Sequence, residues 1–302
     1  MSQALRGHLA MLVFSALVAG SFALGAAIAR EISPIAFTAL RFWLAAVVIG
    51  IAASATGGGA GEAWRAPWRY LVLGSVFASY FVLMFEGLKT APPVSAAAVF
   101  TLTPIVTAVS GWLILRQVTT ARIALALAVG AAGALWVIFR ADLGALLAFE
   151  VGRGEAIYFL GCVAHAVYVP LVRRLNRGES AIRFTFGTLV AGAVVLTLVG
   201  AGAIRQTDWL ALRPLVWITL AYTTLFATAA SFVLTQYAAL RLPSAKVMAY
   251  TYLTPSWVIL WEIALGHGAP PGLVSVGVGL TVVALVLLLR EETPAPRLAR
   301  RG

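Results

Sequence analysis

Ten apolar stretches follow one another along this 302-residue chain, and no other feature limits its fold as strongly. Each stretch approaches the roughly 20 residues that an α-helix needs to cross the hydrocarbon core of a bilayer. The alternating pattern of a membrane β-barrel is absent from the sequence. The sequence therefore predicts an all-α membrane protein with ten transmembrane helices, at about residues 8–29, 34–54, 69–88, 93–115, 122–139, 154–172, 183–203, 214–240, 243–265 and 272–290.

Composition agrees with a membrane protein, because 61% of the residues are hydrophobic and 11% are charged, whereas soluble domains carry about 25% charged residues. The first stretch has one property of a secretory signal, a cleavage-like sequence at 27–29. Its apolar run is longer than the roughly 7–15 residues of a signal core, so we expect a retained helix. The single cysteine, Cys162, lies in the sixth stretch, and no intrachain disulfide is expected.

The net charge of +11 reflects how the chain is oriented in the membrane and does not indicate an acidic binding partner. The basic residues are spread over short connections between spans, so no nucleic-acid partner is expected. If the N-terminus is cytoplasmic, the larger share of Lys and Arg falls on the inner connections, as the positive-inside rule requires. We therefore predict a multi-pass protein of the cell inner (plasma) membrane with both termini, including the tail 291–302, in the cytoplasm.

An internal repeat divides the chain into two halves. The phrase Leu-Thr-Pro occurs within both VSAAAVFTLTPIVTAVSG (94–111) and KVMAYTYLTPSWVILWE (246–262), and neighbouring residues match at the same offset, Pro92 with Pro243 and Phe81 with Phe232. The alternative is a chance likeness between two proline-containing spans. Because each half has five spans, an odd number, the second half crosses the membrane in the opposite orientation to the first. Such inverted repeats are a recurrent plan of secondary transporters. We predict repeats at 1–140 and 154–290, a connector at 141–153, and a central cavity between the repeats.

The chain also resembles a known family. The segment FEGLKTAPPVSAAAVFTLTPIVTAVSGWLIL resembles the EamA-type repeat of the drug/metabolite transporter superfamily, and ISPIAFTALRFWLAAVVI is similar to that family's second helix, which often carries an arginine at the position of Arg41. The resemblance covers about residues 7–290 as two units. Family members commonly have Gly-Glu after the fourth and ninth helices, where this chain has Arg116-Gln117 and His267-Gly268.

This resemblance implies a secondary transporter that exports small metabolites by alternating access. It is greatest for ten-helix bacterial exporters, and the YddG-like exporters of aromatic amino acids and methyl viologen are the preferred branch. The alternative within the same fold is a multidrug or quaternary cation exporter. The expected partners are a small-molecule substrate and the lipid bilayer, and a monomer is compatible with this plan.

The two central prolines are candidate hinges. Proline removes a backbone donor and displaces the carbonyl four residues earlier, so Pro104 frees the carbonyl of Phe100 and Pro255 frees that of Thr251. Such breaks persist in lipid where hydroxyl groups, protein or water satisfy the freed carbonyl. We expect the fourth and ninth helices to bend around a polar cavity. The alternative is two ordinary kinked spans with no role in transport.

Candidate substrate-binding residues are polar or aromatic and are placed near the middle of spans. In the ninth span, Tyr250, Thr254 and Trp257 follow helical spacing and form one stripe. Aromatic rings that face a cavity stack flat substrates or hold cations. The alternatives are an interfacial aromatic belt for the tryptophan and a hydrogen-bonded core role for a lone histidine. The full set is Tyr80, Phe100, Thr103, His165, Tyr168, Tyr250, Thr254 and Trp257.

Two charges within the spans are candidate coupling or structural groups, since intramembrane charges are costly. Arg41 and Glu262 lie near the outer ends of the second and ninth spans, close enough to reach the surface. We leave open a mutual ion pair and a role in substrate amine binding or proton coupling. The sequence lacks the H-E-x-x-H, G-x-S-x-G and P-loop motifs, so neither an enzyme nor a cofactor or metal site is expected. A channel is also less expected, because no rings of like charge are evident.

Overall fold

The computed structural model describes residues 3–55, 66–148 and 150–290, and the regular structure among them is entirely helical. The tail predicted at 291–302 lies outside the described residues. Two short helices, α7 and α10, lie in connections at Leu143–Ala148 and Ala201–Gln206. The longer elements are α1 (Gln3–Ile28), α2 (Pro34–Ala55), α3 (Trp68–Gly87), α4 (Pro93–Phe100), α5 (Thr103–Leu115), α6 (Ala121–Ile138), α8 (Arg153–Leu175), α9 (Ala181–Val199), α11 (Pro214–Thr224), the π-helical η2 (Leu225–Ala230), α12 (Ser231–Ala239), α13 (Ser244–Ala249), the 3₁₀-helical η3 (Tyr250–Leu253), α14 (Thr254–Ala264) and α15 (Gly272–Arg290).

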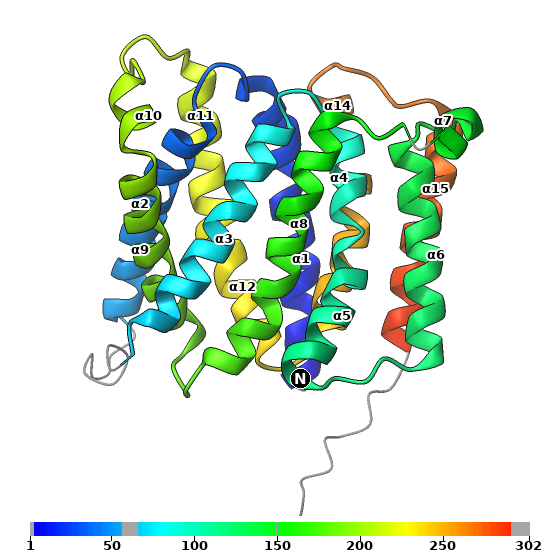
Figure 1. The fold of residues 1–302 in the computed structure, drawn as a ribbon, viewed down its shortest axis with the longest axis horizontal. Helices are drawn as coiled ribbons and strands as arrows, with labels where there is room; N and C mark the ends of the chain where they lie inside the picture. The colour runs from blue at the N-terminus through cyan, green and yellow to red at the C-terminus, as the bar shows by residue number, and fades with distance from the viewer. Residues whose placement is uncertain (1–2, 56–65, 149, 291–302) are drawn as a thin grey trace, which may run out of the picture.

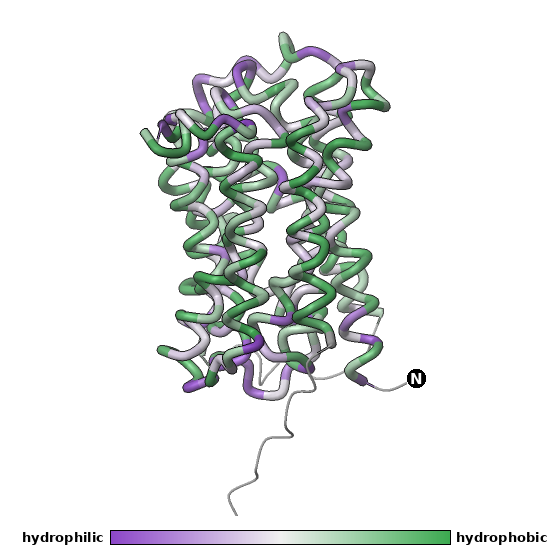
Figure 2. Tube along the Cα trace, turned by 90° about the vertical axis from the view of Figure 1, so that its right-hand side faces the viewer, coloured by the Kyte–Doolittle hydropathy of each residue, from purple (hydrophilic) through white to green (hydrophobic). Residues whose placement is uncertain are grey.

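The predicted all-α membrane fold is confirmed. Nine helical segments among the described residues are long and apolar enough to cross a membrane, with α4–α5 and α11–η2–α12 each forming one span. The tenth apolar stretch is the one that η3 interrupts between α13 and α14. Figure 2 shows apolar residues along the lengths of the helices and hydrophilic residues concentrated towards the two ends of the bundle.

Helix ends follow local sequence signals. Pro93 and Pro214 lie in the first turns of α4 and α11, where the missing backbone N–H costs nothing. The Thr120 hydroxyl accepts a hydrogen bond from the backbone N–H of Ile123 and caps α6. Just before that connection, at the C-terminal end of α5, Arg116 adopts a left-handed conformation with φ 56° and ends the helix. These signals mark where α4, α6 and α11 begin and where α5 ends.

Helices from the two halves of the chain pack together. Helix α3 packs against α8, α1 against α12 and α14, α2 against α9, and α6 against α15. In Figure 1, α2 and α9 lie at one end of the bundle and α6 and α15 at the other, with α1, α3, α8 and α12 between them. The chain starts at the bottom edge, whereas α7 precedes α8 at the top edge, so α1 and α8 run in opposite directions.

Glycines allow the closest of these contacts. A Cβ atom added to Gly74 of α3 would lie 2.5 Å from the backbone nitrogen of Gly192 in α9. One added to Gly133 of α6 would lie 2.5 Å from the carbonyl oxygen of Gly277 in α15. Small residues at such positions let transmembrane helices approach backbone to backbone, which increases the dispersion contacts between them. These glycines thereby hold α9 close to α3 and α15 close to α6.

Candidate functional site

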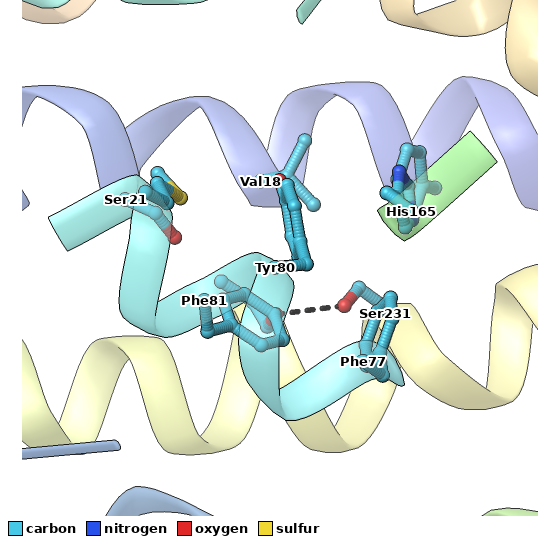
Figure 3. Close-up of a pocket in the computed structure, with 10 residues that line it drawn as sticks. Val18, Ser21, Phe77, Tyr80, Phe81, His165 and Ser231 are labelled. Atoms are coloured by element: carbon cyan, nitrogen blue, oxygen red, sulfur yellow. Dashed lines mark hydrogen bonds between the residues drawn. The ribbon is translucent and has the colours of Figure 1, made fainter. Parts of the chain in front are cut away.

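A small pocket lies between α1, α3, α8 and the η2–α12 segment. Its space for water-sized contents is about 10 Å³, enough for about one water molecule. Figure 3 shows the side chains around it, with the dashed line marking the hydrogen bond that the Ser231 hydroxyl donates to the carbonyl of Ala227 at 2.8 Å. The lining residues are Phe14, Val18, Ser21, Phe77, Tyr80, Phe81, Met84, His165, Ala227 and Ser231.

An aromatic cage surrounds His165, which lies near the middle of α8. Its ring stacks on Tyr80 and Phe100 at centroid distances of 4.6 and 5.3 Å, and Phe77 lies at 5.2 Å. Neither nitrogen of this buried imidazole has a hydrogen-bond partner among the described residues. Buried polar groups normally have partners, so a polar group of a ligand or a water molecule would satisfy these atoms.

Four of the predicted substrate-binding residues, His165 itself and three of the rings near it, belong to this histidine cage. Tyr80 and His165 line the pocket itself. Phe100 stacks on both of them, and Tyr168 stacks on Phe77 at 4.3 Å and lies 6.5 Å from the His165 ring. The Tyr168 hydroxyl accepts a hydrogen bond of 2.9 Å from Gln236 of α12. The cage therefore joins helices from both halves of the chain.

The stripe on the ninth span does not line this pocket. The Tyr250 hydroxyl lies 3.1 Å from Nδ1 of His8, and the Trp257 indole N–H donates to the Ser15 hydroxyl at 3.2 Å, so both side chains contact α1. Thr254 is buried, and its hydroxyl has no partner among the described residues. Tyr250 and Trp257 therefore share a face across η3, and that face meets α1 and not the pocket.

Both candidate hinge prolines lie where their helices are interrupted. Pro104 is in the first turn of α5 and Pro255 in that of α14. The carbonyl of Phe100 accepts a hydrogen bond of 2.6 Å from the hydroxyl of Thr103. The matching carbonyl of Thr251 accepts from a backbone N–H in the tighter η3 turn instead. The two breaks thus satisfy their freed carbonyls by different means.

Arg41 is buried rather than extended towards the membrane surface, which corrects the expectation that it reaches the outer face. Its Nη2 donates to the carbonyl of Ala227 at 3.0 Å and its Nε donates to the hydroxyl of Thr228. The guanidinium lies 3.9 Å above the centre of the Phe81 ring. The side chain points inward because η2 offers a carbonyl and a hydroxyl oxygen, and the ring face adds a cation–π contact.

Glu262 does not pair with Arg41. Its carboxylate lies 3.1 Å from Nδ1 of His267, in the turn that follows α14. His267 lies five positions after Glu262 in the chain, whereas Arg41 lies within the bundle against η2. Glu262 therefore belongs to the end of the bundle in this conformation. Among the described residues, no three His, Cys, Asp or Glu side chains come together as metal ligands.

Ion pairs connect distant parts of the chain at the ends of the spans. Arg69 at the start of α3 donates to Glu179 at 2.7 Å, in the connection between α8 and α9. Burial opposes ionisation of Glu179, but hydrogen bonds from Arg69 and from backbone N–H groups outweigh it and lower the pKa of the carboxyl. At another connection, the hydrogen bond from Arg213 lowers the pKa of Glu31.

Several lining residues escape sequence reasoning. Phe14, Phe77 and Phe81 look like any aromatic residues in an apolar span, and only the spacing of Phe77, Tyr80 and Phe81 along one helix hints at a shared site. The π-helical turn η2 contains no proline or glycine that would mark it. Which helix each ring faces depends on packing between spans that are far apart in the sequence.

A bundle of apolar helices that run in both directions around a pocket at mid-span is the plan of a multi-pass membrane transporter. Comparison with known proteins gives the family. The model of the EamA-like transporter family matches residues 5–139 and 152–290, and the chain belongs to this family.

One curated protein and one solved structure are also similar to this chain. The chain is 26% identical over 261 residues to a protein from Bacillus subtilis (strain 168) named uncharacterized transporter YyaM. The aligned region covers 86% of each chain. A solved crystal structure is similar over 95% of this chain and 96% of its own, with a TM-score of 0.71 and 22% identity, and this likeness concerns the fold alone. The protein is therefore a membrane transporter of the drug/metabolite transporter superfamily.

Proposed function

We propose that this transporter exports small metabolites from the cytoplasm across the inner membrane, and that aromatic amino acids are its main substrates. The observation that carries the proposal is the cage around His165, in which aromatic rings surround an imidazole whose nitrogens have no partner. Flat rings stack on such walls, and polar groups on the substrate satisfy the buried nitrogens. In this proposal both termini lie in the cytoplasm, and the specific likeness is to the YddG-like exporters.

Alternating access would operate through the two repeats, 1–140 and 154–290, joined by the connector 141–153. The pocket has room for about one water molecule here, so substrate entry requires the surrounding helices to separate. The interruptions before Pro104 and Pro255 are the proposed hinges, because residues at element ends absorb the backbone rotation of domain movements. Rocking of one repeat against the other would then open the cage to each side in turn.

A multidrug or quaternary cation exporter is the second candidate. Aromatic walls favour it, since cations bind over ring faces. The buried guanidinium of Arg41 against Phe81 and Ala227, which both line the pocket, opposes it, because like charges repel in a medium of low polarity. Amino acids, which carry a carboxylate, fit this surrounding better than permanent cations do.

The test is uptake and counterflow of radiolabelled phenylalanine, tyrosine and methyl viologen in proteoliposomes. We expect saturable movement of the aromatic amino acids, reduced by about tenfold or more in His165→Leu, which keeps bulk but removes the polar atoms that would contact substrate. The matched control is Leu160→Ala, a change on the same helix at a side chain that is 60% exposed on the outer surface of the bundle. A folded protein that moves no amino acid, or equal transport by His165→Leu and wild type, would contradict the proposal.

A further inference from the structure

We infer that Arg41 binds the carboxylate of the transported molecule, so that the substrates are compounds with one carboxylate and an aromatic or apolar body. This inference rests on the proposed function and assigns a specific chemical group of the substrate to a specific side chain. Three observations carry it: the missing counter-charge, the unused edge of the guanidinium, and the position of Arg41 behind the pocket wall.

The first observation is that Arg41 has no acidic partner in the part of the chain that the structure describes. The four ion pairs found there are formed by other basic residues, Arg69, Lys89, Arg213 and His267. The contacts of Arg41 are a hydroxyl, a carbonyl and two aromatic rings, all of them neutral. A buried charge within a membrane span is costly unless it is paired, so a substrate anion that arrives with each transport cycle supplies what the chain does not.

The second observation is the geometry of the unused donors. Nε and Nη2 of Arg41 each donate to η2, and Nη1 is buried with no hydrogen-bond partner. Nη1 carries two N–H groups, and Nη2 has a second N–H beyond the one directed at Ala227. The edge between Nη1 and Nη2 therefore retains two donors side by side. This is the arrangement that receives both oxygens of a carboxylate, and η2 fixes the guanidinium so that little side-chain freedom is lost on binding.

The third observation is that the guanidinium of Arg41 lies directly behind the wall of the proposed substrate site. Phe81 and Ala227, which contact the guanidinium, both line the pocket. The hydroxyl of Ser21 on the opposite wall is buried without a partner in the described chain and is available to a carboxylate oxygen. Figure 3 shows Ser21 and Phe81 towards one end of the pocket and His165 towards the other. A substrate of this class would place its carboxylate at the Ser21 end and its ring in the histidine cage.

A purely structural role for Arg41 makes a different prediction. In that case the guanidinium only clamps the π-helical turn, and its loss would reduce transport of every substrate by the same factor. Carboxylate binding instead predicts that the ratio of rates between a carboxylate and its neutral analogue depends on Arg41. The ratio is therefore the quantity to measure, because it does not change with the fraction of active protein.

The experiment compares phenylalanine with phenylalaninamide, which replaces the carboxylate by a neutral amide, in proteoliposomes of wild type, Arg41→Gln and Thr228→Val. We expect wild type to prefer phenylalanine by roughly tenfold to a hundredfold, the range of a charge-assisted hydrogen-bonded pair. Arg41→Gln should lower phenylalanine transport to the level of the amide. Thr228→Val removes the neutral partner of Nε and leaves the Nη1–Nη2 edge in place, so the preference should persist.

Two results would overturn the inference. One is a wild type that moves the amide as fast as the acid, in which case amino acid export stands and carboxylate recognition by Arg41 falls. The other is an Arg41→Gln variant that keeps the wild-type ratio. If Arg41→Gln does not fold, Arg41→Lys takes its place; it keeps the charge but loses the paired N–H groups, so it should lower the preference for phenylalanine, and an unchanged ratio would overturn the inference. A wild type that moves neither compound overturns the proposed function and this inference with it.

Discussion

The contact between α6 and α15 makes a quantitative prediction about stability. Gly277 lies where these two helices meet, and a Cβ atom at this position would be 2.7 Å from the carbonyl oxygen of Gly133. Ordinary contact begins at 3.4 Å, so Gly277→Ala requires the helices to separate by about 0.7 Å at this point (3.4 − 2.7). Gly279 on the same helix provides the control, because nothing lies within 4 Å of its Cβ position.

The expected cost follows from overpacking. Inserting a methyl group into a closely packed contact costs about 1–3 kcal/mol when backbone atoms must move. The same substitution gains up to about 1 kcal/mol of helix propensity at either position, so this gain cancels when the two variants are compared. Gly277→Ala should therefore be about 1–3 kcal/mol less stable than Gly279→Ala. A Gly133→Ala change should behave like Gly277→Ala, since its Cβ would lie 2.5 Å from the carbonyl oxygen of Gly277.

The assay is reversible unfolding of purified protein in mixed micelles, with helix content followed by circular dichroism. A difference of about 1.4 kcal/mol corresponds to a tenfold change in the folding equilibrium, well within the range of such a measurement. If Gly277→Ala were as stable as Gly279→Ala, the two helices would not meet backbone to backbone at these glycines. The packing argument for this end of the bundle would then be refuted.

Two further predictions concern single contacts. Because the Arg69 ion pair helps to lower the pKa of Glu179, the stability that the pair contributes is complete above the ordinary pKa of 4.5 and is lost as the pH falls through the lowered value. The melting temperatures of wild type and Glu179→Gln should therefore differ at pH 7 and converge in acid, and a difference that stays constant with pH would refute this. Thr103→Val should lower the free energy of unfolding by about 1–3 kcal/mol, because it removes the hydroxyl that bonds the Phe100 carbonyl. Thr254→Val should be neutral or stabilising, because the Thr254 hydroxyl has no hydrogen-bond partner among the described residues, and unfolding measurements that rank the two variants the other way would contradict this prediction.

The sequence predicts the spans well and their interruptions partly. Apolar length alone determines which segments cross the bilayer, and prolines mark the breaks before Pro104 and Pro255. The π-helical turn at Leu225–Ala230 was not predicted, since no residue in it requires that geometry. Arg41 on another helix donates to a carbonyl and a hydroxyl oxygen of this turn, a contact that the sequence does not reveal.

The candidate site is predictable only in part for a related reason. Tyr80 and His165 are conspicuous as polar residues at mid-span, and both line the pocket. Tyr250 and Trp257 are equally conspicuous, yet they hydrogen-bond to α1. Spacing along one helix shows which residues share a face, but it does not show which neighbour that face meets.

The sequence by itself determined that this protein is a helical membrane protein, that its spans number about ten, and that Leu-Thr-Pro recurs in two of them. These properties follow from local chemistry: apolar length, proline and the cost of unpaired backbone groups in lipid. Only the tertiary structure decided that Arg41 points inward against Phe81 and that aromatic rings enclose His165. Those arrangements depend on contacts between helices far apart in the chain, where packing and the pairing of buried polar groups select one partner among many similar apolar faces.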